Sequence, residues 1–252
     1  MINILLSGAC GRMGQAISAL CENFENLNIS CGFDSFIGLN AKYPIYDDFE
    51  KINEPVDVII DFSNPSNTEN LLSYAERNSI PCIIATTGLS AEQKELMNEI
   101  SKKIPVFFSA NMSLGVNLII ALAQKAAKIL SDDFDIEIIE KHHNQKLDAP
   151  SGTALAIADA ITEAVDNSMQ YVYDRHSVRK KRDKSEIGIH AVRGGTIVGE
   201  HDVIFAGNHE IIEINHRADS REIFATGALK AAEFIFGKPS GMYSMKDLFG
   251  NI

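Results

Sequence analysis

Residues 2–14 read Ile-Asn-Ile-Leu-Leu-Ser-Gly-Ala-Cys-Gly-Arg-Met-Gly, an apolar run that leads directly into a glycine-rich turn. An apolar run of this length predicts a strand, and behind the turn apolar residues recur at helical spacing over 17–24. A second apolar run, 29–33, ends on Asp34. The order of strand, glycine turn, helix, strand and acid predicts one half of a Rossmann-type nucleotide-binding fold.

The glycines of this turn have separate physical roles. In the usual G-x-G-x-x-G spacing the three positions fall on Ala9, Gly11 and Gly14, so the first glycine is displaced to Gly8. One glycine permits the tight turn, one lets the backbone approach a pyrophosphate, and one lets the helix pack close to the strand. A glycine-rich turn without a ligand is the alternative, but the flanking strand, helix and acid favour nucleotide binding.

Asp34 stands where an acid accepts hydrogen bonds from the ribose of a dinucleotide. Its neighbours Ser35 and Phe36 offer no positive charge for a 2′-phosphate. Arg12 lies in the glycine turn and can offset this preference. The sequence therefore predicts that NADH is preferred and that NADPH is possible.

The first half of the chain continues to alternate between strands and helices. Residues 56–62, 80–85 and 106–108 read as buried strands, and 91–103 reads as a helix. Polar turns follow the strands: Phe62-Ser63, Thr86-Thr87-Gly88 and Ser109-Ala110-Asn111. Because ligands of open α/β sheets bind beyond the carboxyl ends of the strands, these turns and residues 8–14 are expected at one edge.

The second half has a different character. A long helix is predicted over 116–130, followed by a strand over 134–139, and residues 166–184 read as an irregular loop. Three further strands are joined by short glycine turns, which predicts antiparallel pairing; they are expected at 186–192, 196–205 and 210–217. The fold class is therefore α/β, a Rossmann-like parallel sheet domain plus an α+β substrate and oligomerisation domain with a mixed, largely antiparallel sheet.

Composition narrows the classes of function. The formal net charge of −11 argues against a nucleic-acid partner, and the basic run 179–184 is expected to be a solvated loop. No apolar run reaches the roughly 20 residues that a membrane span needs, and the start of the chain does not resemble a signal peptide. The four cysteines fit neither a zinc site nor a disulfide framework. A cytoplasmic protein with a small-molecule substrate is expected.

Residues 140–153 gather proton-donating groups ahead of a predicted helix. His142, His143 and Lys146 precede a Pro-Ser-Gly-Thr turn, and a helix start presents free N–H groups that suit an anion. A metal site is disfavoured, because adjacent histidines on a strand point to opposite faces and no H-E-x-x-H occurs. Asp148 is interpreted as a helix cap or a partner of the lysine.

These groups predict a reductase that acts on an anionic substrate. Either His142 or Lys146 can supply the proton that accompanies a hydride. His143, Lys146, the N–H of Gly152 and the hydroxyl of Thr153 can hold carboxylates. The histidines of the late strands are interpreted as structural or interfacial; they are His190, His201, His209 and His216.

Several motifs occur in an order that resembles the 4-hydroxy-tetrahydrodipicolinate reductase family, formerly called dihydrodipicolinate reductases. They are Gly8-Ala9-x-Gly11-Arg12-Met13-Gly14, Asp61-Phe62-Ser63, Ala85-Thr86-Thr87-Gly88, residues 109–117, Glu140-x-His142-His143-x-x-Lys146-x-Asp148-Ala149-Pro150-Ser151-Gly152-Thr153-Ala154, and Val198-Gly199-Glu200-His201. The resemblance covers nearly the whole chain.

The resemblance implies reduction of 4-hydroxy-tetrahydrodipicolinate to tetrahydrodipicolinate by NADH or NADPH in lysine and diaminopimelate biosynthesis, without a metal. It implies that His142 is the acid/base residue, that Lys146 is a proton donor, and that the dicarboxylate substrate is bound by His143, Gly152 and Thr153. The residues implied to line the cofactor are Gly8, Ala9, Cys10, Gly11, Arg12, Met13, Asp34, Ala85, Thr86, Thr87, Ser109, Ala110, Asn111 and Met112.

The resemblance also implies the organisation of the chain. Residues 1–112 and 221–252 would form the dinucleotide-binding domain, and 113–220 the substrate-binding and oligomerisation domain of a homotetramer. Many members carry an arginine after the ribose-binding acid, and Ser35 departs from this pattern, which supports the preference for NADH.

Two other classes of function compete with this reading. Another nicotinamide oxidoreductase of the same two-domain plan, such as an amino-acid dehydrogenase, would keep the glycine turn without the motif at 140–153. A regulator that senses NAD would need a DNA-binding segment, and neither the net charge of −11 nor a helix-turn-helix stretch supports one.

Overall fold

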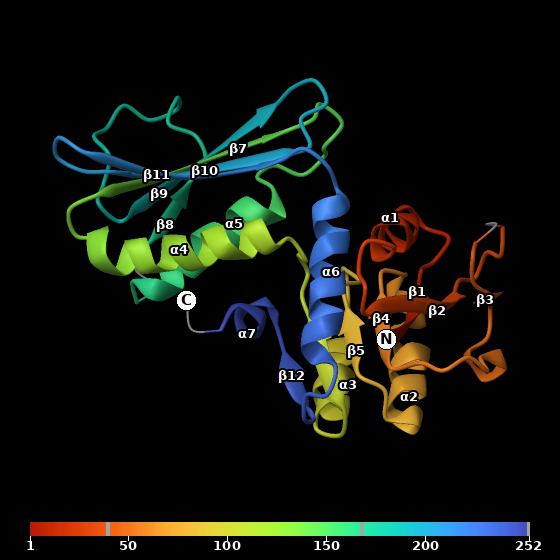
Figure 1. Cartoon of the computed structure of the whole chain (residues 1–252). Helices are drawn as coiled ribbons and strands as arrows, with labels where there is room; N and C mark the ends of the chain where they lie inside the picture. Colours follow the sequence, from red (N-terminus) through yellow and green to blue (C-terminus); the bar gives the residue numbers. More distant parts are fainter. Residues whose placement is uncertain (39–40, 167–168, 251–252) are drawn as a thin grey trace. The chain divides into compact units, whose positions relative to one another are not determined.

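The apolar runs of the first 110 residues form one parallel sheet in the computed structural model, which describes residues 1–38, 41–166 and 169–250 (Figure 1). The chain divides into two compact units. Unit 1 comprises Met1–Leu114 and Glu222–Ile252, and unit 2 comprises Gly115–Arg221. Each unit has its own sheet and its own hydrophobic core.

The sheet of unit 1 has seven strands in the order β12-β6-β5-β4-β1-β2-β3. The strands are β1 (Ile2–Ser7), β2 (Leu27–Phe33), β3 (Ile45–Tyr46), β4 (Val58–Asp61), β5 (Cys82–Ile84), β6 (Pro105–Phe108) and β12 (Gly241–Tyr243). All pairs in this sheet are parallel. Along the chain, β2 and β3 are added on one side of β1, and β4, β5, β6 and β12 are added on the other side. The order therefore reverses between β1 and β4, which is where open α/β sheets bind ligands.

Helices cover both faces of this sheet. They are α1 (Arg12–Cys21), α2 (Thr68–Asn78), α3 (Ala91–Ser101), α6 (Glu222–Ile235) and α7 (Met245–Phe249), with short 3₁₀ turns η1 (Phe49–Lys51) and η2 (Pro65–Asn67). Ile4 and Leu6 of β1 face α1 and α6, whereas Leu5 faces α2 and α3. Successive residues of a strand point to opposite faces, so a nearly continuous apolar strand can fill both cores. Each such side chain contributes about 1.5–3 kcal/mol on burial.

Unit 2 has a five-stranded sheet in the order β11-β10-β7-β9-β8. Its elements are α4 (Leu114–Leu130), β7 (Asp135–His142), α5 (Gly152–Ala164), β8 (Gln170–Val172), β9 (Glu186–Arg193), β10 (Gly199–Ala206) and β11 (Ile211–Ala218). Apolar residues of α4 and α5 pack against one face of this sheet, where Ile136 and Ile138 of β7 are fully buried. The α/β class with a parallel sheet and a separate mixed sheet is thereby confirmed.

Two expectations for unit 2 are wrong. The strands β9 and β10 do not form a hairpin; β7 lies between them, parallel to β9 and antiparallel to β10. Their connection crosses the end of β7, where Gly194 N donates to His142 O at 2.9 Å. Two of the four strand pairs are antiparallel and two are parallel, so the sheet is mixed, as expected. The segment expected to be an irregular loop also contains the short strand β8.

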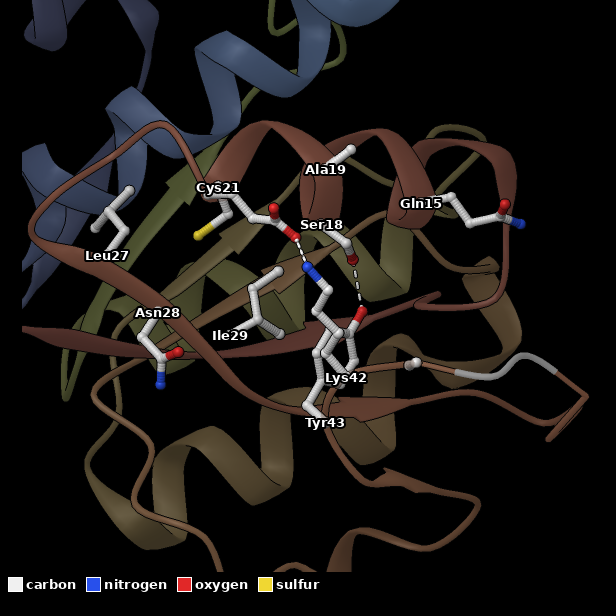
Figure 2. A pocket seen from close by; sticks show the side chains of 11 residues that line it. Gln15, Ser18, Ala19, Cys21, Leu27, Asn28, Ile29, Lys42 and Tyr43 are labelled. Atoms are coloured by element: carbon white, nitrogen blue, oxygen red, sulfur yellow. Dashed lines mark hydrogen bonds and ion pairs between the residues drawn. The ribbon is translucent and has the colours of Figure 1, made fainter.

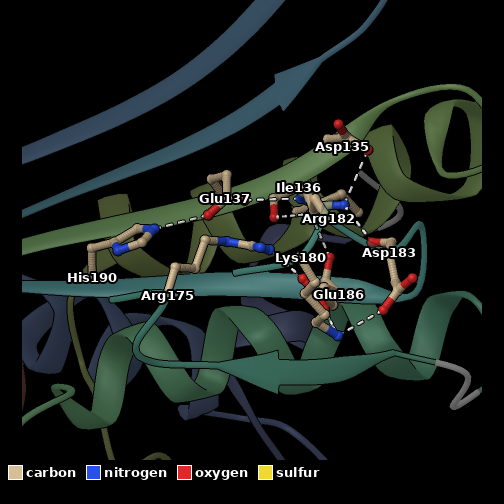
Figure 3. Close-up of polar contacts among 9 residues, drawn as sticks. All are labelled: Asp135, Ile136, Glu137, Arg175, Lys180, Arg182, Asp183, Glu186 and His190. Carbon is tan, nitrogen blue, oxygen red and sulfur yellow. Dashed lines mark hydrogen bonds and ion pairs between the residues drawn. The ribbon is translucent and has the colours of Figure 1, made fainter. Parts of the chain in front are cut away.

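The basic run at 179–184 is a loop, as expected, and all of its residues are exposed except the half-buried Arg182. The Arg182 guanidinium lies against Glu137 and Asp135, at 3.0 Å from each, and donates to the Ile136 carbonyl at 2.8 Å (Figure 3). Lys180 contacts the buried Glu186 at 3.0 Å. The contacts of Arg182 have no local signal in the sequence, because its acidic partners lie about 45 residues away, on β7. These contacts tie the run to the sheet.

Candidate active site

The glycine turn of unit 1 brings three chain segments into backbone contact. Gly8 has a φ of +82°, and a Cβ there would lie 2.7 Å from Phe62 O. A Cβ on Gly14 would lie 2.3 Å from Gly8 O, so the start of α1 can approach the turn only without a side chain. No side chain caps α1 and its first turn has no acidic residue, so the start of this helix suits an anion.

Asp34 follows β2 and is held beside this turn. Its Oδ2 accepts from Cys10 N at 2.9 Å, and its Oδ1 accepts from Phe36 N at 3.1 Å. The carboxylate is therefore oriented by two backbone groups before any ligand binds. A negative charge fixed next to the glycine turn matches the position of the ribose-binding acid in the predicted fold.

A pocket of about 240 Å³ lies at the carboxyl ends of β4, β5 and β6, within unit 1. Its lining residues are Met13, Phe62, Ser63, Ala85, Thr86, Thr87, Ala110, Met112 and Phe224. Several were expected from the sequence, and Ser109 and Asn111 support the neighbouring turn through the bond from Ser109 Oγ to Asn111 O at 2.7 Å. Phe224 was missed, since it comes from a helix more than a hundred residues later in the chain.

Thr86 in this pocket is fixed by a buried carboxylate. Its hydroxyl donates to Asp61 Oδ2 at 2.7 Å, and Asp61 is fully buried at the end of β4. Asp61 Oδ1 also accepts from Ser63 N at 3.2 Å. The polar wall of the pocket is thus set by hydrogen bonds between neighbouring strand ends.

A second pocket of unit 1, about 370 Å³, lies beside α1 and the first residues of β2 (Figure 2). The Ser18 and Tyr43 hydroxyls, 2.6 Å apart, and the ion pair of Lys42 with Glu22 border it. It includes Leu27 and Ile29, at the amino end of β2. Since ligands of such sheets bind at the carboxyl ends, and none of the predicted site residues lines it, this pocket is not the candidate site.

In unit 2, every second side chain of β7 is buried, and these buried side chains change from apolar to polar towards the end of the strand. Ile136, Ile138, Glu140 and His142 are all buried on the same side of the strand. Glu140 accepts two hydrogen bonds from Arg193, each at 2.7 Å, and one from Ser151 N at 3.0 Å. Burial alone would raise the pKa of Glu140, but the bonds from Arg193 and His142 outweigh it and keep the pKa below its ordinary value.

His142 is oriented by that carboxylate. Its Nδ1 lies 2.7 Å from Glu140 Oε2, so Nδ1 carries a proton and donates it to the ionised oxygen. Burial lowers the pKa of His142, and Glu140 offsets this only in part, while Lys146 and Arg193 lower it further. The imidazole is therefore held neutral near pH 7, with Nε2 as an acceptor.

His201, interpreted from the sequence as structural, belongs to the same cluster. Its ring meets that of His142 edge to face at 5.3 Å, and its Nε2 lies 3.0 Å from Ser151 Oγ. Burial lowers the pKa of His201 to about 4, and the neighbouring His142 contributes. Ser151 also caps α5 by accepting from Ala154 N. Because β10 pairs with β7, no local pattern in the sequence could have brought these residues together.

The remaining predicted residues of unit 2 surround the end of β7. Lys146 pairs with Asp148 at 2.9 Å, so Asp148 is the partner of the lysine and Ser151 is the cap. His143 is half-buried and directly follows the last residue of β7. Gly152 and Thr153 begin α5, and a Cβ on Gly152 would meet nothing within 4 Å. Arg193, which binds Glu140, was not expected from the sequence.

The structure describes residues 1–38, 41–166 and 169–250. In that part of the chain no cluster of three or more His, Cys, Asp or Glu side chains is arranged to hold a metal ion. No helix there has the length and apolar character to cross a membrane.

Comparison with known proteins decides the family. A family model for the N-terminus of dihydrodipicolinate reductase matches residues 2–112, and the model for the C-terminus matches residues 115–249. The chain belongs to the dihydrodipicolinate reductase family. It is an oxidoreductase of the family that uses a pyridine nucleotide in lysine and diaminopimelate biosynthesis.

Relatives match along the whole chain. The 4-hydroxy-tetrahydrodipicolinate reductase of Caldanaerobacter subterraneus is 50% identical over 248 residues, 98% of each chain. That of Clostridium tetani is 51% identical over 245 residues, 97% of this chain and 96% of the relative.

Solved structures share the fold. The dihydrodipicolinate reductase of Paenisporosarcina sp. TG-14, solved with dipicolinate bound, superposes with a TM-score of 0.83 at 24% identity over 97% of each chain. A diaminopimelate dehydrogenase of Corynebacterium glutamicum gives 0.60 at 14% identity over 100% of this chain and 96% of the other.

The buried histidine predicts a pH dependence of stability. The pKa of His201 is about 4 when folded and about 6.5 when unfolded, so between these values the unfolded state binds more protons. The free energy of unfolding should therefore fall as the pH drops from about 6.5 to about 4, by on the order of 3 kcal/mol. Urea unfolding of the wild type and of His201→Gln measures it. The carboxylates contribute a loss of unfolding free energy to both proteins. If the wild type and His201→Gln lost equal amounts, the contribution assigned to His201 would be contradicted.

Proposed function

We propose that this reductase converts 4-hydroxy-tetrahydrodipicolinate to tetrahydrodipicolinate, with unit 1 binding the nucleotide and unit 2 binding the dicarboxylate. Overall, one hydride and one proton enter and one water leaves. The observation that carries the proposal is the buried Glu140–His142 pair at the end of β7, which is hydrogen-bonded to the cap of α5 and feels the charge of Lys146. The decisive experiment mixes the purified protein with enzymatically generated substrate and follows the loss of NADH absorbance. No substrate-dependent loss would refute the proposed function.

The nucleotide is assigned to the edge of the unit 1 sheet where β1 and β4 diverge. Residues 8–13 would hold the pyrophosphate and Asp34 the ribose, with the pocket at the ends of β4, β5 and β6 receiving the nicotinamide end. Residues 109–112 form the turn beside that pocket. Both oxygens of Asp34 already accept backbone hydrogen bonds, and its negative charge opposes a 2′-phosphate. These contacts support the preference for NADH over NADPH.

Lys146 is assigned the delivery of the proton. The Nδ1 proton of His142 is bound to Glu140, and burial lowers the pKa of the imidazole, so His142 holds no spare proton near pH 7. The Lys146 ammonium group pairs with Asp148 at 2.9 Å and is only partly buried. Neutral His142 then acts as the acid/base partner through Nε2, which can accept a hydrogen bond from the substrate or from the ammonium group.

The carboxylates of the substrate are assigned to the start of α5. The first turn of this helix contains no acidic residue, and there is open space where a side chain on Gly152 would lie. The Thr153 hydroxyl and the His143 ring would complete the anion site. A dianionic substrate suits a helix start that is held beside a lysine.

A homotetramer is proposed as the assembly. The strand β11 lies at the edge of the unit 2 sheet, and Ile211 and Ile212 on it are 65% and 38% exposed. An edge strand that exposes large apolar side chains is a common site of association between subunits. The late strands would thereby serve the oligomerisation that the sequence suggested.

Replacing Lys146 tests the proton donor. In Lys146→Ala, turnover should fall roughly 10²- to 10⁴-fold, the range of a general acid, while the affinity for NADH stays unchanged. Steady-state kinetics and fluorescence titration of NADH measure the two quantities. Lys125→Ala, an exposed lysine of α4, is the matched control and should behave as the wild type. Unchanged turnover in Lys146→Ala would remove Lys146 from the mechanism.

Replacing Asp34 tests the ribose contact. In Asp34→Ala, the KM for NADH should rise roughly tenfold or more, because a charged hydrogen bond is worth about 1.5–3 kcal/mol. The KM for NADPH should rise less. Asp34→Asn keeps the shape of the side chain and removes its charge, so it should mainly relax the discrimination against NADPH. Equal losses for both nucleotides in Asp34→Ala would rule out the ribose assignment.

A further inference from the structure

We propose that Glu140 and Arg193 are positioning residues for the reduction: Glu140 fixes the tautomer of His142 and the place of the α5 start, and Arg193 holds Glu140. The inference rests on the proposed function of the site and adds to it two residues that do not touch the reacting atoms. It follows from the hydrogen bonds of one carboxylate and from the charges that surround His142.

Glu140 is fully buried, and both of its oxygens are fully engaged. Oε1 accepts from Arg193 Nη2 at 2.7 Å and from Ser151 N at 3.0 Å, and Oε2 accepts from Arg193 Nη1 and His142 Nδ1, each at 2.7 Å. A carboxylate has about four acceptor positions. Since all of its neighbours are donors, Glu140 can serve this arrangement only in its ionised form.

This arrangement leaves His142 one possible tautomer. With Nδ1 donating to Glu140, Nε2 bears the lone pair. A Cβ on Gly199 would lie 3.1 Å from that Nε2, so the glycine keeps this side of the ring clear. The acceptor nitrogen of His142 is therefore set by Glu140, and it is not crowded by a side chain at Gly199.

The same carboxylate fixes the substrate-binding end of α5. Ser151, whose N–H is bound to Glu140, caps α5 through its hydroxyl and contacts His201 through the same oxygen. The residues proposed to bind the dicarboxylate, Gly152 and Thr153, come next in the chain. One side chain thus sets both the orientation of the imidazole and the position of the carboxylate-binding N–H groups, and displacements of about 1 Å are costly in catalysis.

Arg193 supplies the charge that balances Glu140 and ties it to the surrounding loop. Besides Glu140, it donates to Asp148 O at 2.7 Å and to Val192 O at 2.8 Å. The groups that face His142 are Glu140, Lys146, Arg193 and His201. Glu140 favours the imidazolium form and Arg193 disfavours it. Burial is the largest cause that keeps the imidazole neutral, and Arg193 adds to it, so a carboxylate can orient His142 without turning it into a cation.

The two residues should shift the titration of His142 in opposite directions. Arg193→Met removes a positive charge, so the pKa of His142 should rise; Glu140→Gln removes a negative charge, so it should fall. In each variant, kcat should drop roughly 10- to 100-fold, the range for groups that orient a histidine, with the KM for NADH unchanged. Arg193→Lys keeps the charge without the paired hydrogen bonds and should recover part of kcat with a nearly unshifted titration.

The measurements are the pH dependence of kcat and an NMR titration of His142 in each variant. Arg182→Met is the matched control, because Arg182 also binds acids of β7 but is not part of the cluster around His142. Its pH profile should match that of the wild type. If Glu140→Gln does not fold, the two Arg193 variants still decide the matter.

Opposite shifts of His142 support the proposal, and so does a loss of kcat confined to the Glu140 and Arg193 variants. Wild-type kcat and an unshifted titration in Arg193→Met would overturn it. Equal shifts in Arg182→Met and Arg193→Met would reduce Arg193 to a structural role. The NMR titration needs no turnover, so an inactive wild type would refute the proposed function while the titration still tests the positioning.

Discussion

A fully buried carboxylate, Glu140, is the constraint on which the site of unit 2 depends. An unpaired charge in such a place would cost several kcal/mol. Arg193, His142 and Ser151 together supply the hydrogen bonds that offset this cost. Arg193 ends β9 and Ser151 precedes α5, so these hydrogen bonds define the relative positions of the ends of β7 and β9 and the start of α5.

Stability alone is a poor explanation for this arrangement. Buried ion pairs are often no more stabilising than apolar residues of the same volume, and β7 could have continued the pattern of Ile136 and Ile138 at positions 140 and 142. What the pair provides is orientation: a neutral imidazole with a known acceptor nitrogen and a helix start held beside it. The unit 1 site follows the same logic, since two backbone N–H groups orient Asp34 before a ligand binds.

The sequence predicted most of unit 1 because its signals are local. The apolar strands, the glycine turn and Asp34 lie in one short stretch, and the carboxyl ends of parallel strands must share an edge. Unit 2 was harder to predict, because β7 lies between β9 and β10 in the sheet. The turn residues between β9 and β10 do not indicate this arrangement. Arg182 and Arg193 bind acidic residues of β7, which lies about 50 residues earlier in the chain. The alternation that ends on Glu140 and His142 was a usable signal, since strand period alone places both side chains on the core face.

The most direct test of the account is the protonation pattern of His142 at neutral pH in the wild-type protein. Nitrogen-15 NMR distinguishes a ring nitrogen that carries a proton from one that bears a lone pair. We expect a proton on Nδ1, bonded to Glu140, and a lone pair on Nε2. A proton on Nε2 with a bare Nδ1, or an imidazolium protonated on both nitrogens, would contradict it.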